Sequence, residues 1–272
     1  MADAPPDLEA VTQVQQQIWS RGDFAKIGTS AQAVAENLCE ALDVVPGRRV
    51  LDVACGAGNG AIAAARRNAE AFGLDYVPAL LDRARERAAA ERYEVEFVEG
   101  DAQALPFEDG SFDYVISTFG AMFAPDQEKT ASELLRVCRS GGKIGMANWP
   151  PHGVVGGAVF KITAEHAPPP PGVLPPVLWG TEERLRELFG EEVSELTVDE
   201  REWTLRYYSP EQWLEFFRNY FGPMITAFER VGEEDAPTLE SDLLEAMRNA
   251  NRAGDAAMIA PAAYAEVIAV RA

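Results

Sequence analysis

The chain has 272 residues, 47% of them hydrophobic and 25% charged, which bounds it to one large α/β domain or one domain with an insertion. Its 24 Lys and Arg stand against 44 Asp and Glu, and a formal net charge of −20 disfavours nucleic acid as a partner because the protein's field repels phosphate. No apolar stretch approaches the roughly 18 residues that span a membrane, and the acidic start lacks the features of a signal peptide. We therefore expect a cytoplasmic protein.

Histidine and cysteine are too sparse for a metal centre. The chain has two histidines and three cysteines. Cys39, Cys55 and Cys138 have neither the spacing of metal ligands nor the even count of a disulfide framework. The sequence therefore predicts no metal site.

The first 45 residues predict a helical segment that lies over a ligand. Residues 1–10 are acidic and contain proline, so we expect them to be disordered, whereas Val11–Ile18 has a helical pattern. The aromatic stretch Trp19–Phe24 suits a lid, with plain surface packing as the alternative. Thr29 and Gln32 have the spacing of a capping box for a further helix. We expect that helix to bury Val34, Leu38, Leu42 and Val45.

Strands and helices alternate regularly over residues 46–149. The predicted strands are Val50–Ala54, Glu70–Leu74 with its end at Asp75, Val95–Val98, Phe112–Ser117 and Lys143–Ala147. The predicted helices are Asn59–Asn68, Pro78–Arg92 and Asp126–Arg139. Such alternation predicts a parallel sheet with helices on both faces, whose ligands lie at the carboxyl ends of the strands.

After Trp149 the regular alternation is lost. The predicted helices are Val154–Ala167, Glu182–Phe189, a helix that begins at Ser209-Pro210 and runs through Phe221, and Thr238–Arg252. Pro168–Pro176 is dense in proline and predicts an extended segment. Leu196–Tyr207 and Tyr264–Val270 have the patterns of two further strands.

The most informative stretch is Val50–Gly60, which reads VLDVACGAGNG. A buried-strand pattern carries one carboxylate, Asp52, and ends in three glycines at alternate positions. Because glycine has no Cβ, the turn can pass closely under a ligand and present its N–H groups to it. Gly56, Gly58 and Ala61 also satisfy the looser pattern of dinucleotide-binding proteins, so a nicotinamide dinucleotide is an alternative ligand at this point.

Two later carboxylates favour a different ligand. Asp75 lies 19 positions after Gly56, where a carboxylate can accept hydrogen bonds from ribose hydroxyls. The segments Gly100–Phe107 (GDAQALPF) and Gly110–Val115 (GSFDYV) follow. Together these features resemble the class I S-adenosylmethionine (SAM)-dependent methyltransferases, and within them the small-molecule enzymes related to the ubiquinone and menaquinone methyltransferases. The resemblance covers residues 45–148.

The resemblance implies the residues of a SAM site, with S-adenosylhomocysteine as the product. Asp75 would bind the ribose, while Asp101 and the backbone of Ala102 would bind adenine. Tyr76 would lie beside the adenine, and Phe119 would lie beneath the sulfonium. The full set of implied cofactor-binding residues is Asp52, Ala54, Gly56, Gly58, Asn59, Asp75, Tyr76, Asp101, Ala102, Thr118 and Phe119.

The same resemblance implies an α/β fold with a Rossmann-like, seven-stranded and mostly parallel sheet, helices on both faces and an antiparallel last strand. Leu196–Tyr207 and Tyr264–Val270 would be its sixth and seventh strands. Residues 1–45 would form a cap, residues 46–149 the SAM-binding core, and residues 150–272 an acceptor-binding insertion with the strands that complete the sheet.

The parts expected to surround the methyl acceptor are rich in aromatic side chains. They are Phe123, Trp149, Phe160, Trp179, Trp203, Tyr207, Tyr208, Trp213, Phe216, Phe217, Tyr220 and Phe221. Several of these must belong to the core, and the helical spacing of the last cluster indicates core. Their number still favours a small apolar or aromatic acceptor. His152 follows the fifth strand and is the candidate general base, with Tyr207 and Tyr208 as further candidates.

The sequence thus predicts a SAM-dependent methyltransferase that methylates oxygen or carbon of a small molecule. One alternative is a regulatory protein that binds SAM and transfers nothing. A less favoured alternative is a nicotinamide-dependent oxidoreductase. We expect no nucleic-acid partner and no membrane span, and a homodimer is one assembly compatible with the sequence.

Overall fold

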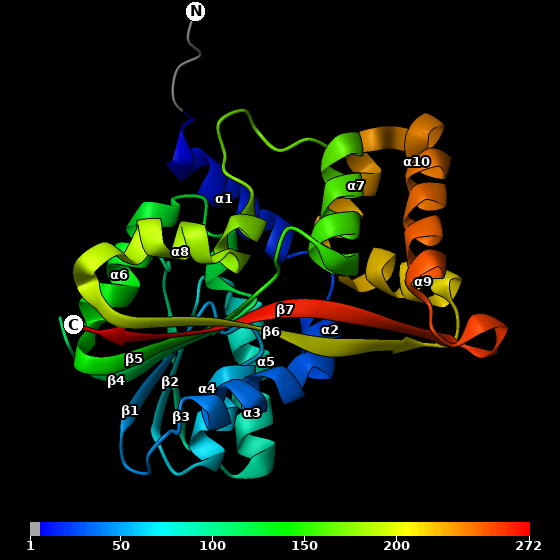
Figure 1. Ribbon diagram of the computed structural model, residues 1–272. Helices are drawn as coiled ribbons and strands as arrows, with labels where there is room; N and C mark the ends of the chain where they lie inside the picture. The colour runs from blue at the N-terminus through cyan, green and yellow to red at the C-terminus, as the bar shows by residue number, and fades with distance from the viewer. Residues whose placement is uncertain (1–5) are drawn as a thin grey trace, which may run out of the picture.

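Seven strands form one sheet in the order β3-β2-β1-β4-β5-β7-β6 (Figure 1). The computed structural model describes residues 6–272. The strands are β1 (Arg49–Val53), β2 (Glu70–Asp75), β3 (Val95–Glu99), β4 (Phe112–Thr118), β5 (Cys138–Asn148), β6 (Val193–Tyr207) and β7 (Met258–Arg271). Strands β1 to β5 pair in parallel, and β7 runs antiparallel between β5 and β6. The predicted fold class is confirmed.

Helices cover both faces of this sheet. They are α1 (Leu8–Trp19), α2 (Phe24–Gly28), α3 (Gln32–Ala41), α4 (Asn59–Arg66), α5 (Pro78–Glu91), α6 (Gln127–Val137), α7 (Phe160–His166), α8 (Glu182–Phe189), α9 (Pro210–Tyr220) and α10 (Gly222–Ala250). In Figure 1, α6 and α8 lie on one face, and α3, α4 and α5 lie on the other. The α1 helix lies at the end of the sheet, above the carboxyl ends of the parallel strands.

Alternate residues of the central strands build the two cores. Val50 and Tyr114 pack in the core that α3 and α4 cover, whereas Leu51 and Val115 pack in the larger core on the opposite face. Successive side chains of a strand point to opposite faces, so an apolar run in a central strand is buried on both sides. This is why the pattern of the glycine-loop strand predicts its place in the middle of the sheet.

The β6–β7 pair is longer than predicted and reaches past the parallel strands. Strand β7 pairs with β5 over Ala265–Val270, and the rest of it pairs only with β6. This extension packs against α9, α10 and the π-helical segment that precedes α7 (Figure 1). Helix α10 contains one non-helical residue, Gly232, whose φ of +75° is in the left-handed region that favours glycine. The predicted helix Thr238–Arg252 corresponds to the part of α10 that follows this break, but that part starts before Thr238 and ends at Ala250.

The start of α1 corrects the expectation of disorder over residues 1–10. The helix begins at Leu8, and the Asp7 carboxylate accepts a hydrogen bond from the Ala10 N–H at 3.0 Å. This side-chain cap satisfies one of the free N–H groups at the helix start. Residues 1–5 lie outside the described residues.

The predicted capping box at Thr29 does not form. The Thr29 hydroxyl donates back to the Lys26 carbonyl at 3.3 Å within a 3-10 turn, and α3 begins only at Gln32. The Gln32 amide instead donates to the Asn59 carbonyl at 3.2 Å, which joins α3 to the start of α4. Val45 lies beyond the end of α3 and is 44% exposed, so its predicted burial is wrong.

Two other boundaries differ from the prediction. The predicted helix Val154–Ala167 is divided, because Gly153–Val159 forms a π-helical segment before α7. Strand β5 starts at Cys138, directly after α6, so the predicted helix end at Arg139 is two residues late. Every helix within residues 6–272 is too short or too polar to traverse a lipid bilayer.

Candidate active site

The glycine loop after β1 folds over a buried carboxylate. Ala54, Gly56 and Gly58 all have positive φ, so the turn has the left-handed conformation that its glycines favour. The Asp52 carboxylate, fully buried below this turn, accepts a hydrogen bond from the Ala61 N–H at 2.9 Å. A Cβ on Gly60 would lie 2.7 Å from that carboxylate, so the approach requires glycine. Asp52 therefore caps the start of α4 and fixes the loop.

Burial of Asp52 has an electrostatic consequence. Removal from water raises the pKa of the Asp52 carboxyl to about 7, although backbone N–H groups of α4 act in the opposite direction. Its Oδ1 atom has no hydrogen-bond partner within residues 6–272. Burial of this carboxylate therefore costs free energy, and the geometry of the glycine loop depends on its presence.

Asp75, at the end of β2, is joined to the same loop. Its Oδ2 accepts from the Gly56 N–H at 2.8 Å, and its Oδ1 accepts from the Val77 N–H at 2.9 Å. Burial raises the pKa of this carboxyl to about 6, so it is mainly ionised at neutral pH. The first and second strand ends are therefore held together by one carboxylate.

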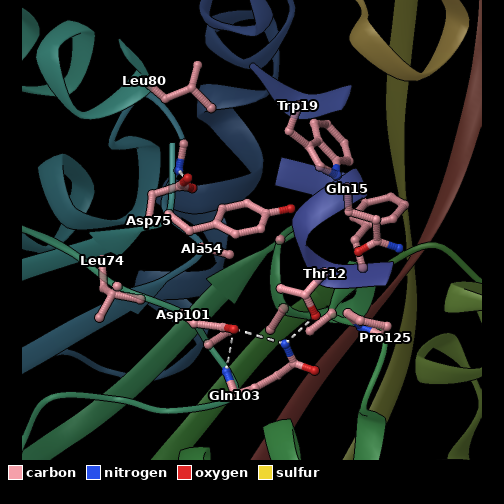
Figure 2. Close-up of a pocket in the computed structure, with 18 of the residues that line it drawn as sticks. Thr12, Gln15, Trp19, Ala54, Leu74, Asp75, Leu80, Asp101, Gln103 and Pro125 are labelled. Atoms are coloured by element: carbon pink, nitrogen blue, oxygen red, sulfur yellow. Dashed lines mark hydrogen bonds between the residues drawn. The ribbon is translucent and has the colours of Figure 1, made fainter. Parts of the chain in front are cut away.

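Asp101 follows β3 and lies beside Gln103. The Asp101 carboxylate accepts from the Gln103 N–H at 2.9 Å and from the Gln103 amide at 3.0 and 3.1 Å. The same amide donates to the Thr12 hydroxyl at 3.0 Å, which ties this strand end to α1 (Figure 2).

These groups surround a cavity at the strand ends, which we call the strand-end cavity. Its volume is about 610 Å³, including its open mouth. Of the eleven predicted cofactor-binding residues, those that line it are Ala54, Gly56, Asp75, Tyr76, Asp101, Ala102 and Phe119. Figure 2 shows Asp75 and Asp101 across the cavity from the side chains of α1.

Four predicted residues do not line this cavity. Asp52 and Gly58 lie in the structure of the loop itself, as described above. The Asn59 side chain donates to the Gly28 carbonyl at 2.7 Å and accepts from Arg87 at 2.8 Å, so it braces the loop from behind. Thr118 ends β4 beside Phe119 and is absent from the wall.

The sequence predicts a lid that includes Trp19 and Phe24, but it does not single out Thr12 and Gln15 of α1 as cavity residues. Thr12, Gln15 and Trp19 line the strand-end cavity from this helix, and Gln15 Oε1 is buried without a hydrogen-bond partner in the described residues (Figure 2). Gln16 on the same helix donates to the Tyr76 carbonyl at 2.5 Å. Thr12, Gln15 and Trp19 are spaced three and four residues apart, which places them on one helix face. This spacing is the signal in the sequence that identifies Thr12 and Gln15 as partners of Trp19.

A second cavity, of about 660 Å³ including its open mouth, adjoins the first, and we call it the aromatic cavity. Its walls are Trp19, Phe24, Ile27, Gly28, Ala31, Phe119, Phe123, Trp149, Val155, Val159, Phe160, Trp203, Leu205, Trp213, Phe217 and Phe221. Trp19, Phe24, Phe119 and Phe123 line both cavities. These four aromatic residues therefore lie at the boundary between the two cavities.

Phe119 is held firmly at this junction. Its ring stacks on Trp149 with centroids 3.9 Å apart, and its φ of +53° is unusual for a bulky residue. The next residue is Gly120, where a Cβ would lie 2.3 Å from the Ala54 carbonyl oxygen. Close contact between the turns after β1 and β4 thus presents the Phe119 ring to both cavities.

His152 is not brought to either cavity. Its side chain is 60% exposed and its Nε2 lies 2.6 Å from a Glu200 oxygen on β6. His152 lies between β5 and the π-helical segment Gly153–Val159, but it is absent from the walls of both cavities, so the predicted proximity to the cleft is not observed. Tyr208 is 88% exposed and Tyr207 is absent from both walls.

A sheet of this order, with a glycine turn after β1 and carboxylates after β2 and β3 facing one cavity, defines a Rossmann-like α/β enzyme of the methyltransferase class. The family model described as a methyltransferase domain matches residues 50–142. The chain belongs to the class I SAM-dependent methyltransferases.

Relatives cover nearly the whole chain. Two uncharacterized proteins of Mycobacterium tuberculosis are 38% identical over 246 residues and 37% identical over 228 residues. The first match covers 89% of this chain and 90% of the relative, and the second covers 83% of each. The demethylmenaquinone methyltransferase of Deinococcus radiodurans is 41% identical over 130 residues, which are 47% of this chain and 54% of that protein.

Solved structures share the fold. The YcgJ protein of Bacillus subtilis has a TM-score of 0.59 at 18% identity, with 88% of this chain and 98% of that chain covered. Phosphoethanolamine N-methyltransferase 2 of Haemonchus contortus, in complex with SAM, has a TM-score of 0.55 at 20% identity, with 88% and 52% covered. At these identities the likeness shows a common architecture.

Proposed function

We propose that the strand-end cavity binds SAM and that the aromatic cavity binds a small apolar or aromatic acceptor, which is methylated on oxygen or carbon. The observation that carries the proposal is the junction of the two cavities, where four aromatic residues line both. A methyl donor and an acceptor in adjoining cavities can meet at this junction without a large rearrangement.

The residues of the strand-end cavity fit the parts of SAM. Asp75 and Asp101 supply acceptors for ribose hydroxyls and the adenine amino group, and the turn at Gly56 leaves room for the methionine part. Gln15 Oε1 is a buried acceptor without a partner, which is the state expected of a group that pairs with a ligand donor. When bound, SAM supplies a methyl group activated by a positively charged sulfonium.

The protein's own part in such a reaction is to orient two ligands and exclude water. Helix α1 covers the strand-end cavity and is held by contacts in its second half and just after its end. Gln16 bonds to the Tyr76 carbonyl, and the Arg21 guanidinium pairs with Glu229 on α10. The Asp23 N–H donates to the Tyr220 carbonyl at 3.0 Å, which fixes the chain between α1 and α2.

Isothermal titration with SAM, S-adenosylhomocysteine and NAD tests the first half of the proposal. We expect SAM and its demethylated product to bind and NAD not to bind. Asp75→Asn is expected to weaken SAM binding, and Asp82→Asn, an exposed carboxylate on α5, is the matched control. NAD binding without SAM binding would contradict the proposal.

A panel of acceptors with SAM, analysed by mass spectrometry, tests the second half. We expect methylated product from apolar aromatic compounds and none from polar metabolites of similar size. SAM binding without product from any acceptor would instead favour the regulatory alternative.

A further inference from the structure

The walls of the aromatic cavity are aliphatic, aromatic or glycine at each of the sixteen positions named above. None of these side-chain types can take up a proton or carry a charge near neutral pH. The cavity draws these residues from widely separated parts of the chain, between Trp19 on α1 and Phe221 after α9. Its apolar character is therefore a property of the assembled site and not of one segment.

The charged groups on the same elements are directed to other partners or to solvent. The pairs are Arg21 with Glu229, His152 with Glu200, Lys161 with Glu165, His166 with Asp242, Arg201 with Glu266, Arg218 with Glu240, Arg248 with Glu211, and Arg252 with Glu202. The Lys26 ammonium lies 4.0 Å from the centre of the Tyr220 ring. Arg206 and Glu215 are exposed, and Asp23 precedes α2 outside the cavity wall.

Two tyrosines pack against residues of the aromatic cavity wall. The Tyr207 ring packs against Phe217, and burial raises the pKa of Tyr207 to about 12. The Tyr264 ring packs against Phe119, and burial raises the pKa of this hydroxyl, which is hydrogen-bonded to the Asn37 side chain. Both hydroxyls are thus neutral near pH 7 and neither acts as a base there.

We propose that the aromatic cavity selects acceptors by their own acidity, so that the physiological acceptor is an aromatic hydroxyl or thiol that loses its proton to bulk water without a protein base. This inference rests on the proposed function of the two cavities; it narrows the oxygen or carbon acceptor named there to oxygen and adds sulfur, which has the same acid chemistry. The shared chemistry is an aromatic oxygen or sulfur anion. An apolar wall disfavours a buried anion, and the positive sulfonium of the methyl donor is the charge that compensates it.

The proton, the two bonds and the charges are all accounted for in this methyl transfer. The acceptor gives its proton to water before its lone pair forms the new bond to the methyl carbon. The bond between that carbon and the donor sulfur breaks, and its electron pair stays on sulfur. An anion and a cation thereby become two neutral products, which an apolar cavity accommodates better than the charged pair.

Binding in the absence of transfer tests the wall directly. The probes are 2-naphthol, 6-nitro-2-naphthol and 2-naphthalenethiol. Their binding is measured between pH 6 and pH 10 by the quenching of tryptophan fluorescence. With S-adenosylhomocysteine, whose sulfur is neutral, we expect the apparent Kd to rise about tenfold per pH unit above each probe's own pKa. With sinefungin, whose amine carries a positive charge, this rise should be strongly reduced. An inflection at one fixed pH for all probes would reveal a titrating protein group and overturn the inference.

Turnover at saturating SAM provides the second readout. Below each acceptor's pKa, kcat/KM should rise about tenfold per pH unit and then reach a plateau whose midpoint follows the acceptor. Tyr207→Phe and Tyr264→Phe should retain this profile. A bell-shaped profile common to all acceptors, or loss of the rising limb in either variant, would contradict the inference.

The two proposals fail in different ways. If the naphthols are methylated with a midpoint fixed by the enzyme, the apolar acceptor stands and only the selection by acidity is wrong. If SAM binds and only polar acceptors are methylated, the proposed function itself is wrong. Equal turnover of a neutral amine such as 2-naphthylamine would also overturn the requirement for an anion.

Discussion

Replacement of Asp52 by Asn should change how the stability of the protein depends on pH. Burial raises the pKa of Asp52 from an ordinary value of 3.8 to about 7, so between pH 5 and pH 7 the native protein holds a proton that the unfolded chain has lost. Stability contributed by this group therefore falls as pH rises through that window. At about 1.4 kcal/mol per pH unit, the loss over the two units is about 3 kcal/mol.

Asp52→Asn keeps an oxygen for the Ala61 N–H and removes the titration. We expect the free energy of unfolding of the variant, relative to the parent protein, to increase by about 3 kcal/mol between pH 5 and pH 8. Urea unfolding at several pH values measures this difference. Asp82→Asn, at an exposed position on α5, is the control and should show a flat difference. A flat difference for Asp52→Asn would refute the reasoning that this carboxylate is destabilised by burial.

Three other substitutions test the site. Gly120→Ala places a Cβ 2.3 Å from the Ala54 carbonyl oxygen, so we expect the free energy of unfolding to fall by about 1–3 kcal/mol, with a lower Tm in thermal unfolding. An unchanged Tm would mean that the turns after β1 and β4 separate freely. Asp101→Asn should weaken SAM binding about tenfold to hundredfold in titration calorimetry, whereas the control Asp109→Asn, on an exposed turn, should leave it unchanged. Equal affinities of the two variants for SAM would remove Asp101 from the site. His152→Ala should keep kcat/KM within about twofold, and a fall of about a hundredfold would restore His152 as the general base.

The fold was predictable because its signals are local. The central parallel strands are short apolar runs that end at a turn or a carboxylate, and the helices between the strands have their own periodicity. Asp75 and Asp101 follow the second and third strands, and parallel strands bring their carboxyl ends to one edge. The position of both carboxylates in one cavity therefore follows from order along the chain.

The remainder of the site was not predictable from local pattern. The aromatic cavity combines Trp19 with residues such as Trp149 and Phe221, which lie more than a hundred positions further along the chain, and no periodicity records such contacts. The helical spacing of Trp213 and Phe217 predicts a buried face but cannot distinguish a solid core from a cavity wall. The sequence predicts His152 near the cleft because it follows β5, yet its neighbours Trp149 and Val155 line the aromatic cavity while the exposed His152 side chain pairs with Glu200.

The failed capping box has a similar cause. Thr29 satisfies the pattern, but its hydroxyl has a nearer acceptor in the turn that joins α2 to α3. Gln32, the second member of the pattern, is used to link α3 with the glycine-loop helix through the Asn59 carbonyl. A side chain that could cap its own helix thus forms its hydrogen bond with a partner that only the folded protein provides.

Trp19 and Phe24 stand in the partition between the two cavities, and they belong to the segment that also covers the first of them. The ligand that binds first must therefore fix the positions of these two rings, and the second ligand packs against them. Thermodynamic linkage requires that any gain in affinity the donor confers on the acceptor is returned by the acceptor to the donor in equal measure.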